Sequence, residues 1–347
     1  MTGAITGCLE MKLPGPRRTS TPVAECPIPC NLCGARDIEE ISRRDRRGKY
    51  LRTTICRRCG LVWSNPRPSE EEVRRYYAHE YRLDYKGRST PSLRQAARSG
   101  RLAVDRYRRL RTLLRPHDAI VDVGAGGGEL VYVLQRLGFN VRGIEPDVRY
   151  AKNARETLGV PIETGFVQTV SFAPNSFTVM TMYHTLEHVE DPSGVLSKLR
   201  RWLTPGGLLI VEVPNVEATC HAPCHRFHFA HLYSFNHQTL EAIGRKVGFV
   251  PLQTETSLDG GTLTCVFRSI GVEQDIDSLA GNCSRVVRLV QEHHMLAHYL
   301  STAPYVRVFR RLRAYVTSRA AIRECTTATQ VLDKLLPDDR TVGVSDT

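Results

Sequence analysis

Residues 119–129 read AIVDVGAGGGE. An apolar run of strand-forming character is followed directly by glycines, which predicts a buried strand that turns sharply into a helix. Glycines allow the backbone to approach a ligand closely, and the N–H groups at the start of a helix can bind a carboxylate or a phosphate. The stretch therefore predicts a ligand-binding loop at the end of a strand in an α/β fold.

Strands and helices alternate after this loop, which predicts an α/β fold with a doubly wound, mostly parallel seven-stranded sheet. The last two strands flank Asp259-Gly260-Gly261 and predict a C-terminal hairpin with one antiparallel edge strand, because a short turn cannot join parallel strands. The expected strands are 119–123, 140–144, one before Phe166, 177–183, 208–213, 250–257 and 262–268, and the expected helices are 129–137, 148–158, 192–203 and 238–246.

Three ligands compete for the glycine loop. A dinucleotide fingerprint would place a third glycine where Glu129 stands, and a phosphate-binding P-loop would need Gly-Lys-Ser/Thr, which is absent. The third candidate is S-adenosylmethionine, because its ammonium suits Asp122 just ahead of the loop. Glu145 ends the next strand, where a carboxylate can accept hydrogen bonds from both ribose hydroxyls. That role fits a nicotinamide dinucleotide equally, so Glu145 supports nucleoside binding without choosing between ligands.

Four cysteines form two close pairs near the N-terminus. Cys30 and Cys33, and then Cys56 and Cys59, are Cys-x-x-Cys pairs that are each followed by glycine. Such pairs can place four thiolates tetrahedrally around one Zn²⁺ ion, as in a zinc ribbon. Four cysteine ligands leave no open position, so the expected site is structural. Cys26 lies close by as a competing ligand with a less suitable spacing.

The length of 347 residues suits two or three domains. No apolar run approaches membrane-spanning length, and the N-terminus lacks the apolar centre of a signal peptide, so we expect a cytoplasmic protein. The expected segments are a disordered N-terminus (1–25), a small zinc ribbon (26–66), a helical linker or lid (67–116), the α/β domain (117–269) and a helical C-terminal extension (270–347).

Positive charge is concentrated in the front third of the chain. Residues 1–115 carry 26 Lys+Arg and 12 Asp+Glu, which leaves 22 basic and 24 acidic residues for the remainder. One further basic run covers residues 307–323. Such asymmetry indicates contact with an anionic partner such as RNA, a nucleotide diphosphate or a phospholipid surface, or else a solvated arginine-rich face. The composition leaves both alternatives open.

Five motifs of the α/β domain follow the order found in class I (Rossmann-like) S-adenosylmethionine-dependent methyltransferases, which the chain resembles. They are Val121 to Gly128, Gly143 to Pro146, Leu186 to Pro192, Leu203 to Gly207 and Val213 to Asn215. The resemblance implies S-adenosyl-L-methionine as cofactor and a methyltransferase domain at 117–269. The implied cofactor-binding residues are Asp122, Gly124, Gly126 and Gly128 around the methionine part, Glu145 at the ribose, Phe166 at the adenine and Tyr183 at the methyl centre.

Histidines gather at two places that we expect at the C-terminal ends of strands, where open α/β sheets carry their chemistry. The first is His184-x-x-Glu187-His188, and the second is the stretch 221–231. A histidine there can be the general base that takes a proton from the acceptor. Alternatively His184, Glu187, His188 and a later histidine hold a divalent metal, or the first motif merely starts a helix and packs on the cofactor. The sequence leaves these three alternatives open.

A second resemblance concerns the candidate catalytic residues His188, His231 and His184. Bacterial deoxysugar C-methyltransferases also place a cysteine zinc module before this fold, and they use histidines at the position of His188 and in a Tyr-His-Glu-His stretch. The corresponding stretch here is 228–231, in which His231 matches while His228 and Ala230 replace Tyr and Glu. The resemblance therefore implies His188 and His231 as the first candidates for base catalysis.

The favoured function is methyl transfer to a small-molecule acceptor, such as a sugar, nucleotide sugar or natural-product intermediate, with a histidine as general base. The alternative is an RNA methyltransferase that binds nucleic acid with its basic ribbon, although the ribbon has few aromatic residues for base stacking. A non-catalytic binding protein fits less well, because the glycine loop and Glu145 are intact. The sequence leaves the oligomeric state and any peripheral membrane contact open.

Overall fold

The computed structural model describes residues 28–67, 91–276, 279–302, 304–306, 308–309 and 322–337. The predictions for the N-terminus 1–25, for Cys26, for residues 68–90 of the linker and for most of the basic run 307–323 lie outside the described residues.

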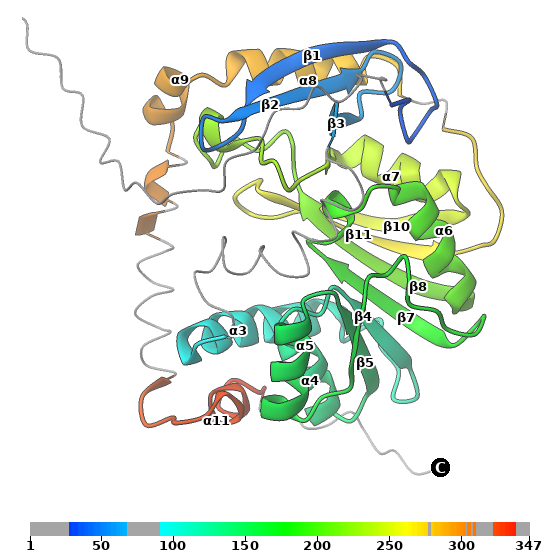
Figure 1. Cartoon of the computed structure of the whole chain (residues 1–347), viewed down its shortest axis with the longest axis vertical. Helices are drawn as coiled ribbons and strands as arrows, with labels where there is room; N and C mark the ends of the chain where they lie inside the picture. Colours follow the sequence, from blue (N-terminus) through cyan, green and yellow to red (C-terminus); the bar gives the residue numbers. More distant parts are fainter. Residues whose placement is uncertain are drawn as a thin grey trace, which may run out of the picture.

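A seven-stranded sheet forms the centre of the molecule (Figure 1) and has the strand order β10-β11-β8-β7-β4-β5-β6. Its five strands from β4 to β8 are parallel, which confirms the doubly wound, mostly parallel class that the alternation predicts. The strands are β4 (Ala119–Val123), β5 (Asn140–Glu145), β6 (Ile162–Thr164), β7 (Phe177–Tyr183), β8 (Leu203–Pro214), β10 (Phe249–Thr256) and β11 (Thr262–Ser269).

The predicted antiparallel C-terminal hairpin is confirmed as β10 and β11, and β10 is the edge strand. β11 pairs antiparallel with β8 on one side and with β10 on the other, so the antiparallel strand lies inside the sheet and β10 forms the edge. The side chains explain this order. β11 buries Leu263, Cys265 and Phe267, whereas most residues of β10 are partly or fully exposed.

Helices cover both faces of the sheet because successive strand residues point to opposite sides. Val121, Met180 and Leu209 pack on one face, together with α6 and α7, and their neighbours Ile120, Val179 and Ile210 pack on the other face with α3 and α4. The bounds are α3 (Leu93–Leu110), α4 (Glu129–Arg136), α5 (Val148–Asn153), α6 (Pro192–Trp202), α7 (His237–Lys246), α8 (Asn282–Glu292), α9 (Met295–Leu300) and α11 (Ala328–Asp333). Among the described residues, no helix has the length and apolar character needed to cross a membrane.

The cysteine-rich segment forms a second, four-stranded sheet of order β1-β2-β3-β9, at the top of Figure 1. β1 (Ile38–Arg44), β2 (Tyr50–Cys56) and β3 (Val62–Ser64) come from the ribbon, whereas β9 (Tyr233–Ser234) comes from the segment that follows β8. The backbone N–H of Arg46 also donates to Phe227, and that of Ser64 donates to Leu232. The ribbon therefore holds residues 227–234, the segment that carries His231, through main-chain hydrogen bonds.

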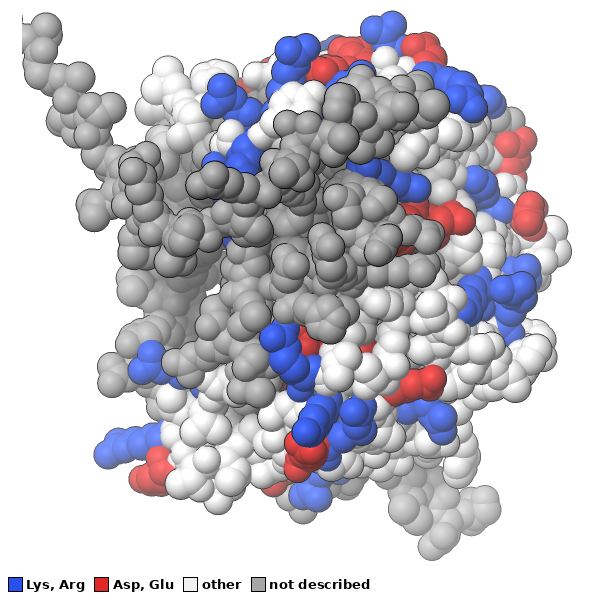
Figure 2. All heavy atoms as spheres, in the orientation of Figure 1, with Lys and Arg blue, Asp and Glu red and all other residues white. Residues whose placement is uncertain are grey.

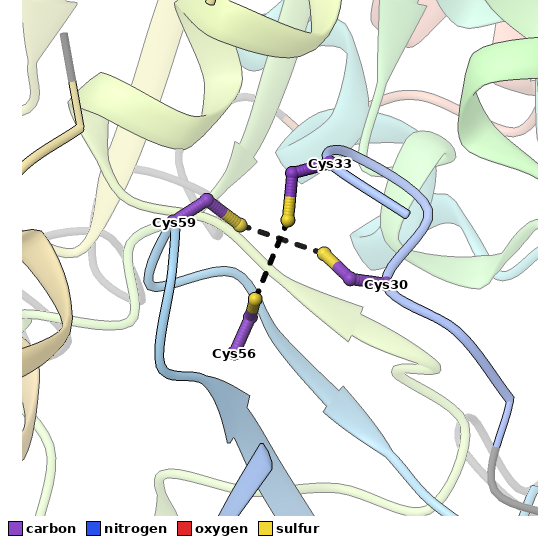
Figure 3. Close-up of side chains that lie close together, drawn as sticks. All are labelled: Cys30, Cys33, Cys56 and Cys59. Carbon is purple, nitrogen blue, oxygen red and sulfur yellow. Dashed lines mark hydrogen bonds between the residues drawn. The ribbon is translucent and has the colours of Figure 1, made fainter. Parts of the chain in front are cut away.

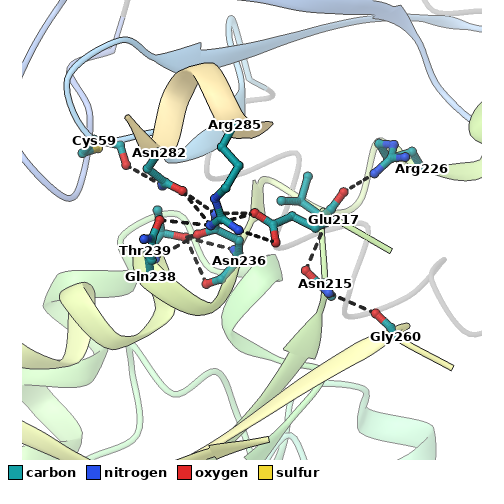
Figure 4. A network of polar contacts seen from close by, with 11 residues as sticks. Cys59, Asn215, Glu217, Arg226, Asn236, Gln238, Thr239, Gly260, Asn282 and Arg285 are labelled. Carbon is teal, nitrogen blue, oxygen red and sulfur yellow. Dashed lines mark hydrogen bonds and ion pairs between the residues drawn. The ribbon is translucent and has the colours of Figure 1, made fainter. Parts of the chain in front are cut away.

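Helix α8 connects the ribbon with the segment between β8 and α7 (Figure 4). Asn282 at its start is 1% exposed, and its Nδ2 donates to the carbonyl of Cys59 at 2.8 Å. Its Oδ1 accepts from Nδ2 of Asn236 at 2.7 Å. Arg285 and Asn236 both reach the Glu217 carboxylate, at 3.0 and 2.9 Å. A buried amide that is bonded at both ends fixes the contact geometry, because each unpaired group would cost free energy.

Candidate active site and metal centre

The glycine loop between β4 and α4 has the left-handed backbone that only glycine adopts readily. Gly124 and Gly126 have φ values of 81° and 60°. A Cβ atom on Gly124 would collide with the side chain of Thr185, which lies at the end of the neighbouring strand β7. A residue with a side chain would therefore not fit at Gly124, both for its backbone conformation and for the space it needs.

Two carboxylates flank this loop. Glu145 at the end of β5 is 2% exposed, and its two oxygens accept from the N–H groups of Gly126 at 2.7 Å and of Asp147 at 3.1 Å. Asp122 near the end of β4 is 4% exposed and accepts from Oγ1 of Thr181 at 2.7 Å. Burial raises the pKa of Asp122 to about 6, although the Thr181 hydrogen bond and the Arg106 charge act in the opposite direction.

One pocket contains most of the predicted cofactor-binding residues. Asp122, Gly124, Gly126, Glu145, Phe166 and Tyr183 all line it. Gly128 does not. It has a φ of 80°, and a Cβ atom there would meet Val160 and Ala154 at 2.9 and 3.0 Å. Its glycine is therefore required for packing the start of α4 against α5 and β6 rather than for lining the pocket.

The pocket also includes residues that sequence reasoning missed. Gln95, Ser99 and Arg106 come from α3, which the sequence placed in a linker or lid. Arg106 lies over the ring of Tyr183 at 3.7 Å and pairs with Glu212 at 2.9 Å. The amphipathic pattern of α3 predicts that one face of this helix packs against the protein. It cannot show that side chains of the helix also line a pocket whose next residue in the sequence is Asp122, 16 residues after Arg106.

The pocket ends at the first histidine cluster. His184 and His188 line it, together with Thr185 and Glu190. His184 has a φ of 52° and lies between two carboxylates, with Nδ1 3.4 Å from Glu187 and Nε2 3.3 Å from Glu212. Burial opposes a charge on His184, but Glu187 and Glu212 outweigh it and raise the pKa of His184 to about 9.

His188 and His231 come together although they are far apart in the sequence. Their ring centroids are 4.9 Å apart, and His231 lies outside the pocket lining, behind His188. Nδ1 of His188 is 2.7 Å from the carbonyl oxygen of Ala230. A carbonyl only accepts, so Nδ1 carries the hydrogen and Nε2 is the lone-pair nitrogen of the neutral ring. Burial and the charges of neighbouring histidines lower the pKa of His231 well below its usual range.

Glu187 lies beneath these histidines. Its side chain is 1% exposed, and neither carboxylate oxygen has a hydrogen-bond partner within the described part of the chain. Nε2 of His188 is 3.8 Å from its Oε1. One ligand atom each from Glu187, His188 and His231 lies within 4.8 Å of the others. The four-ligand alternative is not assembled in full, because both ring nitrogens of His184 face carboxylates.

The four predicted zinc ligands converge in the ribbon (Figure 3). Cys30 Sγ lies 3.4 Å from Cys59 Sγ, and Cys33 Sγ lies 3.5 Å from Cys56 Sγ. All four sulfurs are within 4.8 Å of one another. Zinc–sulfur bonds of 2.3 Å in a tetrahedron would separate sulfurs by about 3.8 Å, so the donor set fits a closed Zn²⁺ site.

The two halves of this site repeat one backbone arrangement. The N–H of Gly34 donates to Cys30 O, and that of Gly60 donates to Cys56 O, each at 2.8 Å. Both glycines have a positive φ, 72° and 76°. The glycine after each pair therefore allows the turn that points two thiols inward.

Comparison with known proteins supports the class that the fold and pocket indicate. Residues 94–254 match a family model described as a methyltransferase domain. The ubiquinone biosynthesis O-methyltransferase of Paramagnetospirillum magneticum is 34% identical over 110 residues, which cover 30% of this chain and 44% of that protein. The same enzyme of Colwellia psychrerythraea is 39% identical over 102 residues, covering 28% and 42%. The chain thus spans less than half the length of the curated relatives it matches.

A solved S-adenosylmethionine-dependent methyltransferase from Mesorhizobium loti is 18% identical and superposes with a TM-score of 0.41, covering 47% of this chain and 96% of that one. The family match, the strand order and the ordered motifs agree with one another. Residues 94–254 are thus similar to a methyltransferase domain, and their sheet has a Rossmann-like, mostly parallel arrangement. A four-cysteine ribbon precedes them, and its sheet is completed by β9 from that part of the chain.

Proposed function

We propose that the protein transfers a methyl group from S-adenosylmethionine to a small-molecule acceptor, with a histidine as general base. The observation that carries this proposal is the continuity of one pocket, which runs from the glycine loop and Glu145 to His184 and His188. A cofactor held at one end would thus present its reactive group beside the histidines at the other end.

The residues at the glycine-loop end of the pocket suit this cofactor. Asp122 is a buried carboxylate next to the loop and would pair with the ammonium group, while Glu145 would face the ribose and Phe166 the adenine. Glu145 accepts backbone hydrogen bonds from Gly126 and Asp147, which hold its carboxylate at the pocket. Gly124 and Gly126 line the same pocket, where the loop backbone would face the methionine carboxylate.

The histidine end of the pocket would remove the proton of the acceptor. The bound cofactor supplies a sulfonium methyl, to which an acceptor lone pair bonds while the carbon–sulfur bond breaks and its electron pair stays on sulfur. Nε2 of His188 takes the acceptor proton, and the Ala230 carbonyl holds the ring in that tautomer. His231 lies behind His188 and, held neutral by burial, adds no competing charge.

The acceptor is a small molecule with a hydroxyl or acidic carbon, such as a sugar, a nucleotide sugar or a natural-product intermediate. The matched relatives are named for ubiquinone biosynthesis, which is small-molecule chemistry. The RNA alternative is less well supported. Arg52 and Arg43 of the ribbon pair with Glu40, and Arg57 pairs with Glu39. Figure 2 shows blue and red side chains interspersed among the described residues at the top of this face.

The four cysteines would hold a structural Zn²⁺ ion, because four thiolates leave no position for substrate. The ion would stabilise the ribbon and, through β3 and β9, the segment that carries His231. Zinc would therefore act on catalysis only through the position of this histidine.

The decisive experiment combines cofactor binding with a methylation screen. Isothermal titration calorimetry should show S-adenosylmethionine binding, and cofactor with a labelled methyl group should label a small-molecule fraction in a metabolite extract. His231→Ala should keep the cofactor affinity and lose turnover, and retained turnover would refute a catalytic role for His231. Label in RNA that weakens steeply with salt would establish the alternative function instead.

A further inference from the structure

His184 occupies a position between two buried carboxylates that the proposed reaction does not explain. Nδ1 is 3.4 Å from Oε1 of Glu187, and Nε2 is 3.3 Å from Oε1 of Glu212. The side chains of Glu187 and Glu212 are 1% and 11% exposed. His184 adopts the left-handed backbone, with a φ of 52°, that a residue with a side chain rarely takes. This conformation places the ring where both of its nitrogens face acids.

The two carboxylates differ in their other partners. Glu212 on β8 is compensated by Arg106 of α3, at 2.9 Å, and it accepts from Oγ1 of Thr264 on β11 at 3.2 Å. Glu187 has no hydrogen-bond donor among the described residues, and the nearest cationic groups in its ion pairs are His184 and His188. Because a buried uncompensated carboxylate is costly, a proton on one of these two histidines would stabilise Glu187.

We propose that His184 is a permanently charged positioning residue that neutralises Glu187 and thereby keeps His188 in its neutral, proton-accepting form. This inference rests on the proposed function, in which His188 is the general base. It assigns His184 a role different from that of a base, although His184 lines the same pocket.

The surroundings of the two histidines favour this distribution of protons. Arg106, Glu212, His184 and Glu187 form a chain of alternating charges that sums to zero when His184 carries its proton. His188 instead faces a carbonyl at Nδ1 and lies beside His231, which is itself flanked by His228 and near the charge of Arg46. A proton on His184 lies between the carboxylates of Glu187 and Glu212, whereas a second proton on His188 would face Glu187 alone, at 3.8 Å, and would lie beside the ring of His231.

The test measures the protonation of His188 directly. In the histidine-labelled protein, ¹⁵N NMR should follow each ring through a pH titration, without any need for turnover. His184→Asn is the first variant, because asparagine tolerates a positive φ. It removes the positive charge that neutralises Glu187. The midpoint of the His188 titration should therefore move up by about one pH unit, the order expected for one charge at the 3.8 Å between His188 and Glu187. Where an acceptor is known, the acidic limb of the kcat/KM profile should move with it.

A second substitution isolates the cause. His184→Asn combined with Glu187→Gln removes both charges, so the His188 midpoint should return toward its wild-type value. His184→Gln serves as a second variant if His184→Asn fails to fold. His237→Gln is the matched control, because His237 also lies near a glutamate, Glu241 at 3.7 Å, but on the exposed surface of α7. It should leave His188 unchanged.

An unchanged His188 midpoint in His184→Asn would overturn the inference, and so would an upward shift that persists in the double variant. Failure of the proposed function looks different. In that case wild-type protein transfers no methyl group to any small molecule, while the His188 midpoint still responds to His184 and Glu187 as described.

Discussion

The Nδ1 atom of His188 and the carbonyl oxygen of Ala230 are 2.7 Å apart. This contact joins the helical turn Leu186–His188, which follows β7, to the segment held by the ribbon, and it fixes which ring nitrogen of His188 bears a hydrogen. A general base in this site therefore depends on a backbone atom from another part of the chain. The relation between these two residues suggests an isosteric test of the mechanism.

His188→Asn should lower kcat by 10²-fold or more and leave S-adenosylmethionine affinity unchanged. The asparagine amide can still donate toward Ala230, but it has no nitrogen in place of Nε2, so the general base is lost at the magnitude typical of such catalysis. Single-turnover methyl transfer and calorimetric binding measure the two effects. His237→Asn, on the surface of α7, is the control. A His188→Asn enzyme with near wild-type kcat would contradict base catalysis at this residue.

Glu145→Gln should weaken S-adenosylmethionine binding by tenfold or more. The carboxylate accepts from two loop N–H groups, at Gly126 and Asp147, and an amide can accept at only one of its two ends. Calorimetry on the folded variant gives the dissociation constant. Glu163→Gln, on the exposed side of β6 nearby, should behave like wild type. Equal affinity in the two variants would exclude Glu145 from the cofactor site.

Cofactor affinity should fall as the pH drops below about 6, because burial raises the pKa of Asp122 to about 6 and only the ionised form pairs with an ammonium group. The effect of the Asp122 titration on the stability of the ligand-free protein has the opposite sign to its effect on cofactor affinity. A raised carboxyl pKa means that the stabilising contribution is present at acidic pH and is lost as pH rises through about 6. Asp122→Asn should therefore raise the Tm of the ligand-free protein at pH 8 while making its weakened cofactor affinity independent of pH between 5 and 8. A pH-dependent affinity in Asp122→Asn would assign the titration to another group.

Chelation should release one zinc ion per chain, unfold the ribbon and abolish turnover while leaving cofactor binding largely intact. The structure extends the effect beyond the ribbon, because β9 and the Ser64–Leu232 hydrogen bond tie residues 227–234 to it. Elemental analysis and hydrogen exchange of peptides around His231 measure both parts. Cys56→Ser should reproduce the effect, and Cys224→Ser, an exposed cysteine outside the cluster, should not. An unaltered circular dichroism spectrum with no zinc released would refute the metal site.

Asn282→Ala should loosen the ribbon without removing a metal ligand. It removes the donor to the Cys59 carbonyl and one of the two acceptors of the Asn236 amide, a loss on the order of 1–3 kcal/mol for each buried group left unpaired. Chemical denaturation and the rate of zinc release to a chelator should both report it. Gln238→Ala, which removes a more exposed contact to Arg285, is the comparison. If both variants lose zinc at the same rate, Asn282 does not hold the ribbon in place.

The sequence by itself determined the parts of this protein that depend on local order. The alternation of apolar runs and glycines determined strands such as β4 and β7, and the spacing of Cys30, Cys33, Cys56 and Cys59 determined a convergent cluster, because each depends on residues close in the chain. The grouping of the glycine loop, Asp122 and Glu145 could be predicted in the same way. Each lies at the end of a predicted strand, and a parallel sheet brings its strand ends to one edge.

Tertiary structure alone decided the relations between distant segments. It placed β11 inside the sheet, made β9 the fourth strand of the ribbon, brought Arg106 of α3 over Tyr183 and set His231 beside His188. It also placed His184 between Glu187 and Glu212. The sequence motif of His184, Glu187 and His188 cannot reveal this, because Glu212 comes from another strand, β8. The reason is physical. Strand order, burial and the compensation of buried charges depend on which side chains meet after packing, and no single segment of the sequence contains that information.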